Sequence, residues 1–239
     1  MTESLEVSVM DTTLVAILAL GFVLGLRHAT DADHVVAVST FVSRERSLQS
    51  AAWIGALWGL GHTATILLVG GAIVLLGLVI PPRVGLSMEF SVAVMLVVLG
   101  TLNVGRAVGS LHDAAHAENG RVAAPSPRLS YTRWSYLRSV AVGAVHGLAG
   151  SAAVALLVLT TIREAGWSMI YLALFGAGTS IGMIALTLMM SASMSLVATR
   201  FAGMERFLPR AMGVVSVLFG LFLVYQIGFA DGLLIEPLN

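Results

Sequence analysis

Apolar stretches of about 20 residues recur along this chain, and they constrain its fold more than any other feature. A helix of that length spans the hydrocarbon core of a bilayer, whereas a soluble core needs no such lengths. Of the 239 residues, 57% are hydrophobic and only 11% are charged, against about 25% charged in soluble domains. The sequence therefore predicts an all-α, polytopic membrane protein.

Six spans are predicted, three in each half of the chain. Their approximate ranges are 12–43, 51–80, 88–109, 137–162, 166–192 and 209–230. The first is too long for one straight crossing, and polar residues interrupt it at 27–34. We therefore expect a broken helix there, as occurs at the ion sites of transporters. The expected organisation is a three-helix unit at 1–109, a connection at 110–136 and a second three-helix unit at 137–239.

The distribution of arginine predicts the orientation in the plasma membrane. Two arginines, Arg83 and Arg163, lie in connections on one side. The connections after the first, third and fifth spans hold ten: Arg44, Arg46, Arg106, Arg121, Arg128, Arg133, Arg138, Arg200, Arg206 and Arg210. Basic residues favour the cytoplasmic side, so both termini are expected outside and the 110–136 connection in the cytoplasm.

Composition also excludes several functions. The net charge is zero, which gives no bias toward nucleic acid. The chain has no lysine, which excludes a P-loop and Schiff-base chemistry. It also has no cysteine, which excludes disulfides, thiolate metal sites and thiol redox relays.

The two halves resemble each other at a nearly constant offset. The stretch 25–28 matches 143–146 at an offset of 118, and 58–63 matches 175–180 at 117. A third pair, 97–100 and 217–220, has an offset of 120. Each half has an odd number of predicted spans, so the halves must be inverted relative to each other. Inverted repeats are common in secondary transporters, whose sites lie near the midplane between the repeats.

A cluster of ligand-type side chains falls at that predicted place. Ionisable groups at membrane depth normally face a protein interior with a partner or ligand. Imidazoles and carboxylates without sulfur suit borderline divalent ions such as nickel, cobalt or zinc. The predicted ligands come from the first, second and fourth spans: His28, Asp31, Asp33, His34, His62 and His146.

The geometry of this cluster depends on whether the first helix is continuous. In a continuous helix His28, Asp31 and His34 span about 120° of one face, and Asp33 points elsewhere to hold an imidazole from behind. An alternative is that Arg27 and Asp31 form a buried ion pair while the histidines hydrogen-bond across helices.

The residues 27–35 resemble the signature of the nickel/cobalt transporter family, His-x4-Asp-His within an intramembrane helix, and 60–63 resemble its second motif, Leu-Gly-His-Ser/Thr. The resemblance implies that His28, Asp31, Asp33, His34 and His62 carry the ion. The family has eight spans and an acidic motif in its second half, and the corresponding stretch 175–180 has no carboxylate here. The stretch 146–151 is more similar to the shorter, six-span urease-accessory relatives.

These observations predict a permease, not an enzyme, that moves Ni²⁺ or Co²⁺ as its substrate and holds no permanent cofactor. Its expected partners are the metal ion and the lipid bilayer, with a homo-oligomer also compatible with the sequence. The resemblance adds urease or hydrogenase maturation proteins. Two alternatives stay open: an exporter of metal or of an anion such as sulfite, and an intramembrane metalloenzyme.

Overall fold

The computed structural model describes residues 2–43, 45, 47–118, 133–149, 162, 164–201 and 203–235, and it describes no side chains at 2–13, 106–118, 133–135 and 205–206. Every regular element in these ranges is helical. The elements are α1 (Thr2–His28), α2 (Ala32–Val42), α3 (Leu48–Leu76), α4 (Pro82–Glu118), α5 (Arg133–Leu148), α7 (Ala165–Arg200), α8 (Met204–Tyr225) and the π-helix η2 (Gln226–Ala230). The prediction of an all-α chain is confirmed for the described residues.

Within the described residues, four segments are long and apolar enough to cross a membrane: Leu48–Leu76, Pro82–Gly105, Ala165–Arg200 and Phe207–Ala230. The pair Leu14–His28 and Ala32–Val42 forms a fifth candidate that is bent by 52°. The predicted break in this first apolar segment is thus confirmed. Part of the predicted span 137–162 lies outside the described residues, and α5 is a helix of 16 residues.

Several helix ends differ from the predicted spans. Helix α3 ends at Leu76, before the predicted 80, because Gly77 takes a positive φ of 62° that terminates the helix. Helix α4 starts at Pro82 and continues to Glu118, well past 109. Helix α7 likewise continues to Arg200, past 192. Hydropathy locates the apolar part of a helix, but polar residues can extend the same helix beyond it.

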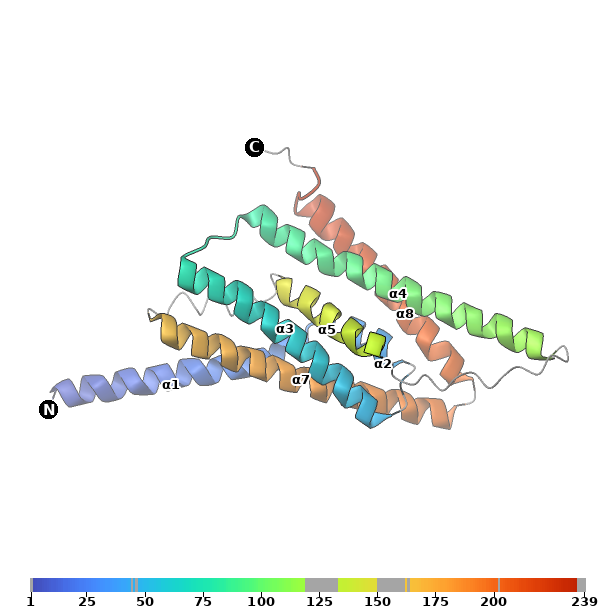
Figure 1. The fold of residues 1–239 in the computed structure, drawn as a ribbon, viewed down its shortest axis with the longest axis horizontal. Helices are drawn as coiled ribbons and strands as arrows, with labels where there is room; N and C mark the ends of the chain where they lie inside the picture. The colour runs from blue at the N-terminus through green and yellow to red at the C-terminus, as the bar shows by residue number, and fades with distance from the viewer. Residues whose placement is uncertain are drawn as a thin grey trace.

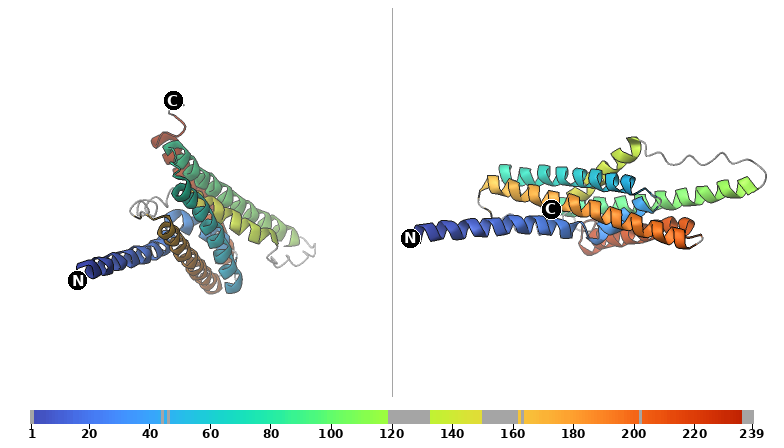
Figure 2. Two further views of the ribbon diagram at one scale, coloured as in Figure 1. Left: turned by 60° about the vertical axis from the view of Figure 1, so that its left-hand side comes forward. Right: turned by 90° about the horizontal axis from the view of Figure 1, so that it is seen from below.

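The helices pack in two groups (Figure 1), and α2 touches helices of both. In the first group, α3 lies between α5 and α7, and α7 also packs against α1. In the second, α4 lies along α8, while α2 touches α4, α7 and α8. The N-terminal part of α1 projects beyond the other helices, as both views of Figure 2 show.

Glycines permit the closest helix approaches. A Cβ at Gly25 of α1 would overlap the carbonyl oxygen of Phe175 in α7, and one at Gly143 of α5 would overlap that of Trp58 in α3. Small residues at such crossings let backbones touch, which is how helices associate in lipid. This close packing holds the polar cluster between the helices.

The break between α1 and α2 follows from local hydrogen bonding. The amides of Thr30 and Asp31 bond three residues back, to the carbonyls of Arg27 and His28, which tightens the end of α1. The Thr30 hydroxyl also donates to the Arg27 carbonyl, at 2.6 Å. Asp31 then takes an extended ψ of 151°, and its carbonyl accepts from the amide of Val35 to start α2. The chain therefore turns at Asp31.

Candidate metal centre

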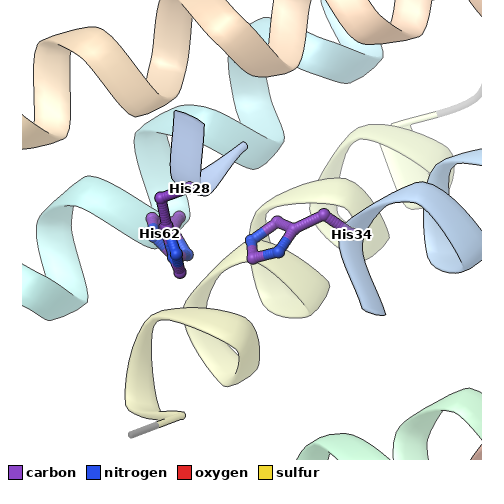
Figure 3. A group of neighbouring side chains, drawn as sticks. All are labelled: His28, His34 and His62. Atoms are coloured by element: carbon purple, nitrogen blue, oxygen red, sulfur yellow. The ribbon is translucent and has the colours of Figure 1, made fainter. Parts of the chain in front are cut away.

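Four helices bring four buried histidines together around this break. His28 is the last residue of α1, His34 lies in the first turn of α2, His62 is in the middle of α3, and His146 is in the last turn of α5. Their exposed fractions are 5%, 0%, 1% and 0%. Figure 3 shows the rings of His28, His34 and His62 turned toward one another.

The break makes this convergence possible. In a straight helix, residues six apart are about 9 Å apart along the axis and about 120° apart around it. Here the ring centroids of His28 and His34 are 4.8 Å apart. The ring of His62 lies 5.2 Å from that of His28 and 5.4 Å from that of His34, and His146 lies 4.7 Å from His34. The arrangement expected for a continuous helix does not hold.

Oxygen acceptors fix three of the four imidazoles. The Nδ1 atom of His28 lies 2.8 Å from Asp31 Oδ2, and that of His34 lies 3.1 Å from Asp33 Oδ1. The Nδ1 atom of His146 lies 3.2 Å from the carbonyl oxygen of Val142. Ionised carboxylates and carbonyls only accept hydrogen bonds, so each Nδ1 is the donor. In a neutral ring the lone pair is then on Nε2.

Those Nε2 atoms have no hydrogen-bond partner. The Nε2 atoms of His28, His34 and His146, and both ring nitrogens of His62, are buried and unpaired in the described structure. Leaving one buried polar atom unsatisfied costs about 1–3 kcal/mol. Metal-binding histidines show the same pattern, with one nitrogen held by a carboxylate or carbonyl and the other free for the ion. The arrangement can therefore bind a cation.

Two ligand sets fit this description. His28, His34 and His62 form one, and Asp33, His34 and His146 form the other; within each set the ligand atoms lie within 4.8 Å of one another. In a tetrahedral shell with metal–nitrogen distances of about 2.0–2.1 Å, ligand atoms are about 3.4 Å apart. Small side-chain movements would close either set around an ion.

Asp31 and Arg27 lie differently from the expectations for a continuous helix. The side chain of Asp31 is 42% exposed and bonds His28 from the edge of the cluster, whereas Asp33 is 15% exposed and lies within reach of two histidines. Arg27 is exposed, and no described ion pair joins it to Asp31. The alternative of a buried Arg27–Asp31 pair is therefore wrong.

Trp58 is a part of the site that the sequence analysis did not single out. It is fully buried, and its ring lies 5.2 Å from His146 and 6.5 Å from His34. Its indole Nε1 has no hydrogen-bond partner among the described atoms. The available signal was helical spacing, because Trp58 precedes His62 by four residues and so shares its face.

This architecture is that of a helical membrane protein in which a histidine cluster is buried at a broken helix. No family model and no solved structure matches the sequence. The chain is 36% identical over 220 residues to the urease accessory protein UreH of Bacillus sp. (strain TB-90), covering 92% of this chain and 95% of the relative. The chain therefore belongs to the UreH family of urease accessory proteins. This supports the expected kinship with nickel/cobalt transporter-like proteins.

Asp31 offers a test of how the imidazoles are oriented. In a His146→Gln background, which leaves only the set with His28, we expect Asp31→Ala to weaken Ni²⁺ binding about 10- to 100-fold, because His28 loses the acceptor that holds its ring. Asp31 makes no side-chain cap to α2, so the substitution removes no capping bond. Isothermal titration calorimetry of the purified protein measures the affinity. Thr30→Ala, in the same break and the same background, is the control and should leave the affinity nearly unchanged.

Proposed function

We propose that this chain is a secondary transporter that moves a divalent transition-metal ion, Ni²⁺ or Co²⁺, across the plasma membrane. The observation that carries the proposal is the group of five buried, unpaired imidazole nitrogens on His28, His34, His62 and His146. Imidazole nitrogen with nearby carboxylate oxygen suits these borderline ions. The role is transport, not catalysis, and the ion is the substrate.

The polarity of the cluster favours a cation over an anion such as sulfite. With each Nδ1 donating to an oxygen, the Nε2 atoms of His28, His34 and His146 present lone pairs to the centre. Lone pairs attract a metal ion and repel an anion. Arg27, which precedes His28 in sequence, is exposed. The unpaired donors among the described side chains of the cluster are the Trp58 indole N–H and one N–H of His62, so most of its unpaired groups are acceptors, which suit a cation.

An inverted repeat, with three spans in each half and both termini outside, is part of the proposal. Reciprocal contacts support it. Gly25 lies against the carbonyl of Phe175, and Gly143 lies against that of Trp58. Gly25 corresponds to Gly143 at an offset of 118, and Trp58 to Phe175 at 117. If each residue is replaced by its counterpart in the other half, the Gly25–Phe175 contact becomes the Gly143–Trp58 contact.

Further contacts obey the same exchange. Gly178 lies against the Phe22 carbonyl, and Gly61, its counterpart at an offset of 117, lies against Val140, the counterpart of Phe22 at 118. The hydroxyls of Thr63 and Ser180, themselves 117 apart in sequence, are 3.0 Å apart. A pair of equivalent residues in contact is what an axis of two-fold symmetry between α3 and α7 predicts. The cluster then lies between the halves, where inverted-repeat transporters bind their substrates.

The relative's name fits this role. A urease accessory protein acts in urease maturation, and we propose that this chain provides nickel for that process. The membrane potential can drive the ion inward, because moving a charge across 100 mV is worth about 2.3 kcal/mol. A divalent ion therefore gains about 4.6 kcal/mol, which is enough for accumulation without ATP.

His62→Leu separates a transport ligand from a structural histidine. Both nitrogens of His62 are unpaired, so an apolar side chain of similar size should leave the melting temperature equal or higher. Nickel accumulation by expressing cells should nevertheless fall at least about tenfold, because a ligand is gone. Uptake of radioactive nickel and a thermal melt of the purified protein give the two readings. Unchanged uptake would contradict the proposal, and vesicles of known orientation would separate import from export.

A further inference from the structure

The two ligand sets of the cluster share one residue, His34. Its Nδ1 is bonded to Asp33 Oδ1 at 3.1 Å, and its Nε2 is its only unpaired nitrogen. One imidazole nitrogen lone pair serves one metal ion. His34 can therefore complete the set with His28 and His62, or the set with Asp33 and His146, but not both at once.

The sets lie at different places in the bundle. The ring of His28 lies against those of His62, at 5.2 Å, and Phe175, at 5.5 Å. The ring of His146 lies instead against that of Trp58, at 5.2 Å. Trp58 precedes His62 by four residues on α3, a displacement of about 6 Å along the helix axis. The second set is therefore shifted toward the end of the bundle where α3 begins.

The outer ligands of the two sets also correspond to each other in the repeat. His28 and His146 are 118 residues apart, the offset that relates the glycine contacts of α1 and α5. The first set thus contains His28 from the first half, and the second set contains the equivalent residue, His146, from the second half. His34 lies on α2, which packs on α4, α7 and α8, and can serve both.

We propose that a single ion occupies these two positions in turn and is handed from one to the other by His34. In the transfer the ion keeps His34, releases His28 and His62, and gains Asp33 and His146. Asp33 already connects the two ends, because its Oδ1 bonds His34 and its Oδ2 lies 3.8 Å from His146 Nε2. The first position is all-imidazole and the second contains a carboxylate. This inference rests on the proposed transport function.

Cobalt binding to three variants of the full-length protein tests the hand-over. Co²⁺ is the probe, with its visible absorption reporting the ligands and calorimetry the affinity and stoichiometry. We expect His28→Gln and His146→Gln each to bind one Co²⁺, with affinities within about threefold of wild type because one position survives. The double variant should lose at least about 100-fold, far more than the two single losses combined.

The spectra decide the assignment of each position. His146→Gln should leave Co²⁺ among imidazoles, and His28→Gln should leave it with mixed nitrogen and oxygen ligands, so the two spectra should differ. Both variants should lose transport, since each lacks one step. Asp33→Asn provides a second way to disable the carboxylate position if His146→Gln does not fold.

Specific outcomes would overturn the hand-over. Identical spectra, or a single variant that binds as weakly as the double variant, would show one undivided site. Two ions per wild-type chain would show two sites that are filled at the same time, which the sharing of His34 forbids. Wild-type rates of transport in either single variant would also overturn it. Failure of the wild-type protein to transport Ni²⁺ or Co²⁺ is a different result, because it contradicts the proposed function itself.

Discussion

A His34→Gln variant should lose both metal binding and metal transport, the largest functional effect expected from any single substitution in the cluster. His34 is fully buried and belongs to both ligand sets. Disturbing a residue that merely orients a ligand costs about 10- to 100-fold in affinity, so losing a ligand of both sets should cost at least about 100-fold. Calorimetry with Ni²⁺ and uptake of radioactive nickel measure the two losses.

Thr40→Val is the matched control for this experiment. Thr40 lies on the same short helix, is 6% exposed, and donates only to the carbonyl of Val36 in its own helix, at 2.8 Å. Valine has nearly the same shape, so the variant tests whether a change inside α2 disturbs transport by itself. Wild-type affinity in His34→Gln would show that His34 is not a ligand. A loss of transport in Thr40→Val would show that the effect of substitutions in α2 comes from packing.

The membrane class and the break after α1 could be predicted from sequence because lipid imposes strict conditions. An unpaired backbone group in hydrocarbon costs several kcal/mol, so long apolar stretches must be helical. The ends of the helices were not accessible in the same way. Helix α4 continues to Glu118 and α7 to Arg200, because helical hydrogen bonding has no need of an apolar sequence once the chain leaves the bilayer.

The members of the cluster could be predicted, but their roles could not. Ionisable side chains at membrane depth indicate a site because burying them in lipid costs free energy. The repeat offset indicated His146 as a further member. Which carboxylate faces which histidine depends on one backbone angle, the ψ of 151° at Asp31. That angle puts Asp31 at the edge and turns Asp33 inward. The direction of a side chain inside a break cannot be predicted from helical periodicity, because the period of 3.6 residues applies only within a helix.

The contribution of Trp58 was missed for a related reason. A tryptophan in an apolar span has many uses, and its sequence neighbours do not show that α5 crosses at this point. The crossing depends on Gly143, where a Cβ would meet the Trp58 carbonyl and lie 2.9 Å from its Cδ1. Contacts between segments far apart in sequence are set by such crossings. The internal repeat was the one sequence feature that carried information about them.

Gly25→Ala should destabilise the protein by about 3 kcal/mol, at the upper end of the usual cost of overpacking. The new Cβ would overlap the Phe175 carbonyl oxygen and lie 2.9 Å from Thr179 N, and backbone atoms cannot rotate away as a side chain can. The α1–α7 crossing must therefore open. Thermal or denaturant unfolding of the purified protein measures the loss.

The repeat makes a matched prediction for Gly143→Ala, because its Cβ would meet Trp58 in the equivalent contact between α5 and α3. We expect the two variants to lose similar stability, since equivalent crossings carry them. Gly85→Ala is the control: Gly85 lies in α4 with nothing within 4 Å of a Cβ, and alanine favours a helix over glycine by about 1 kcal/mol. It should be neutral or slightly stabilising. A large loss of unfolding free energy in only one of Gly25→Ala and Gly143→Ala would mean that the two crossings are not equivalent. That result would contradict the two-fold relation between the halves.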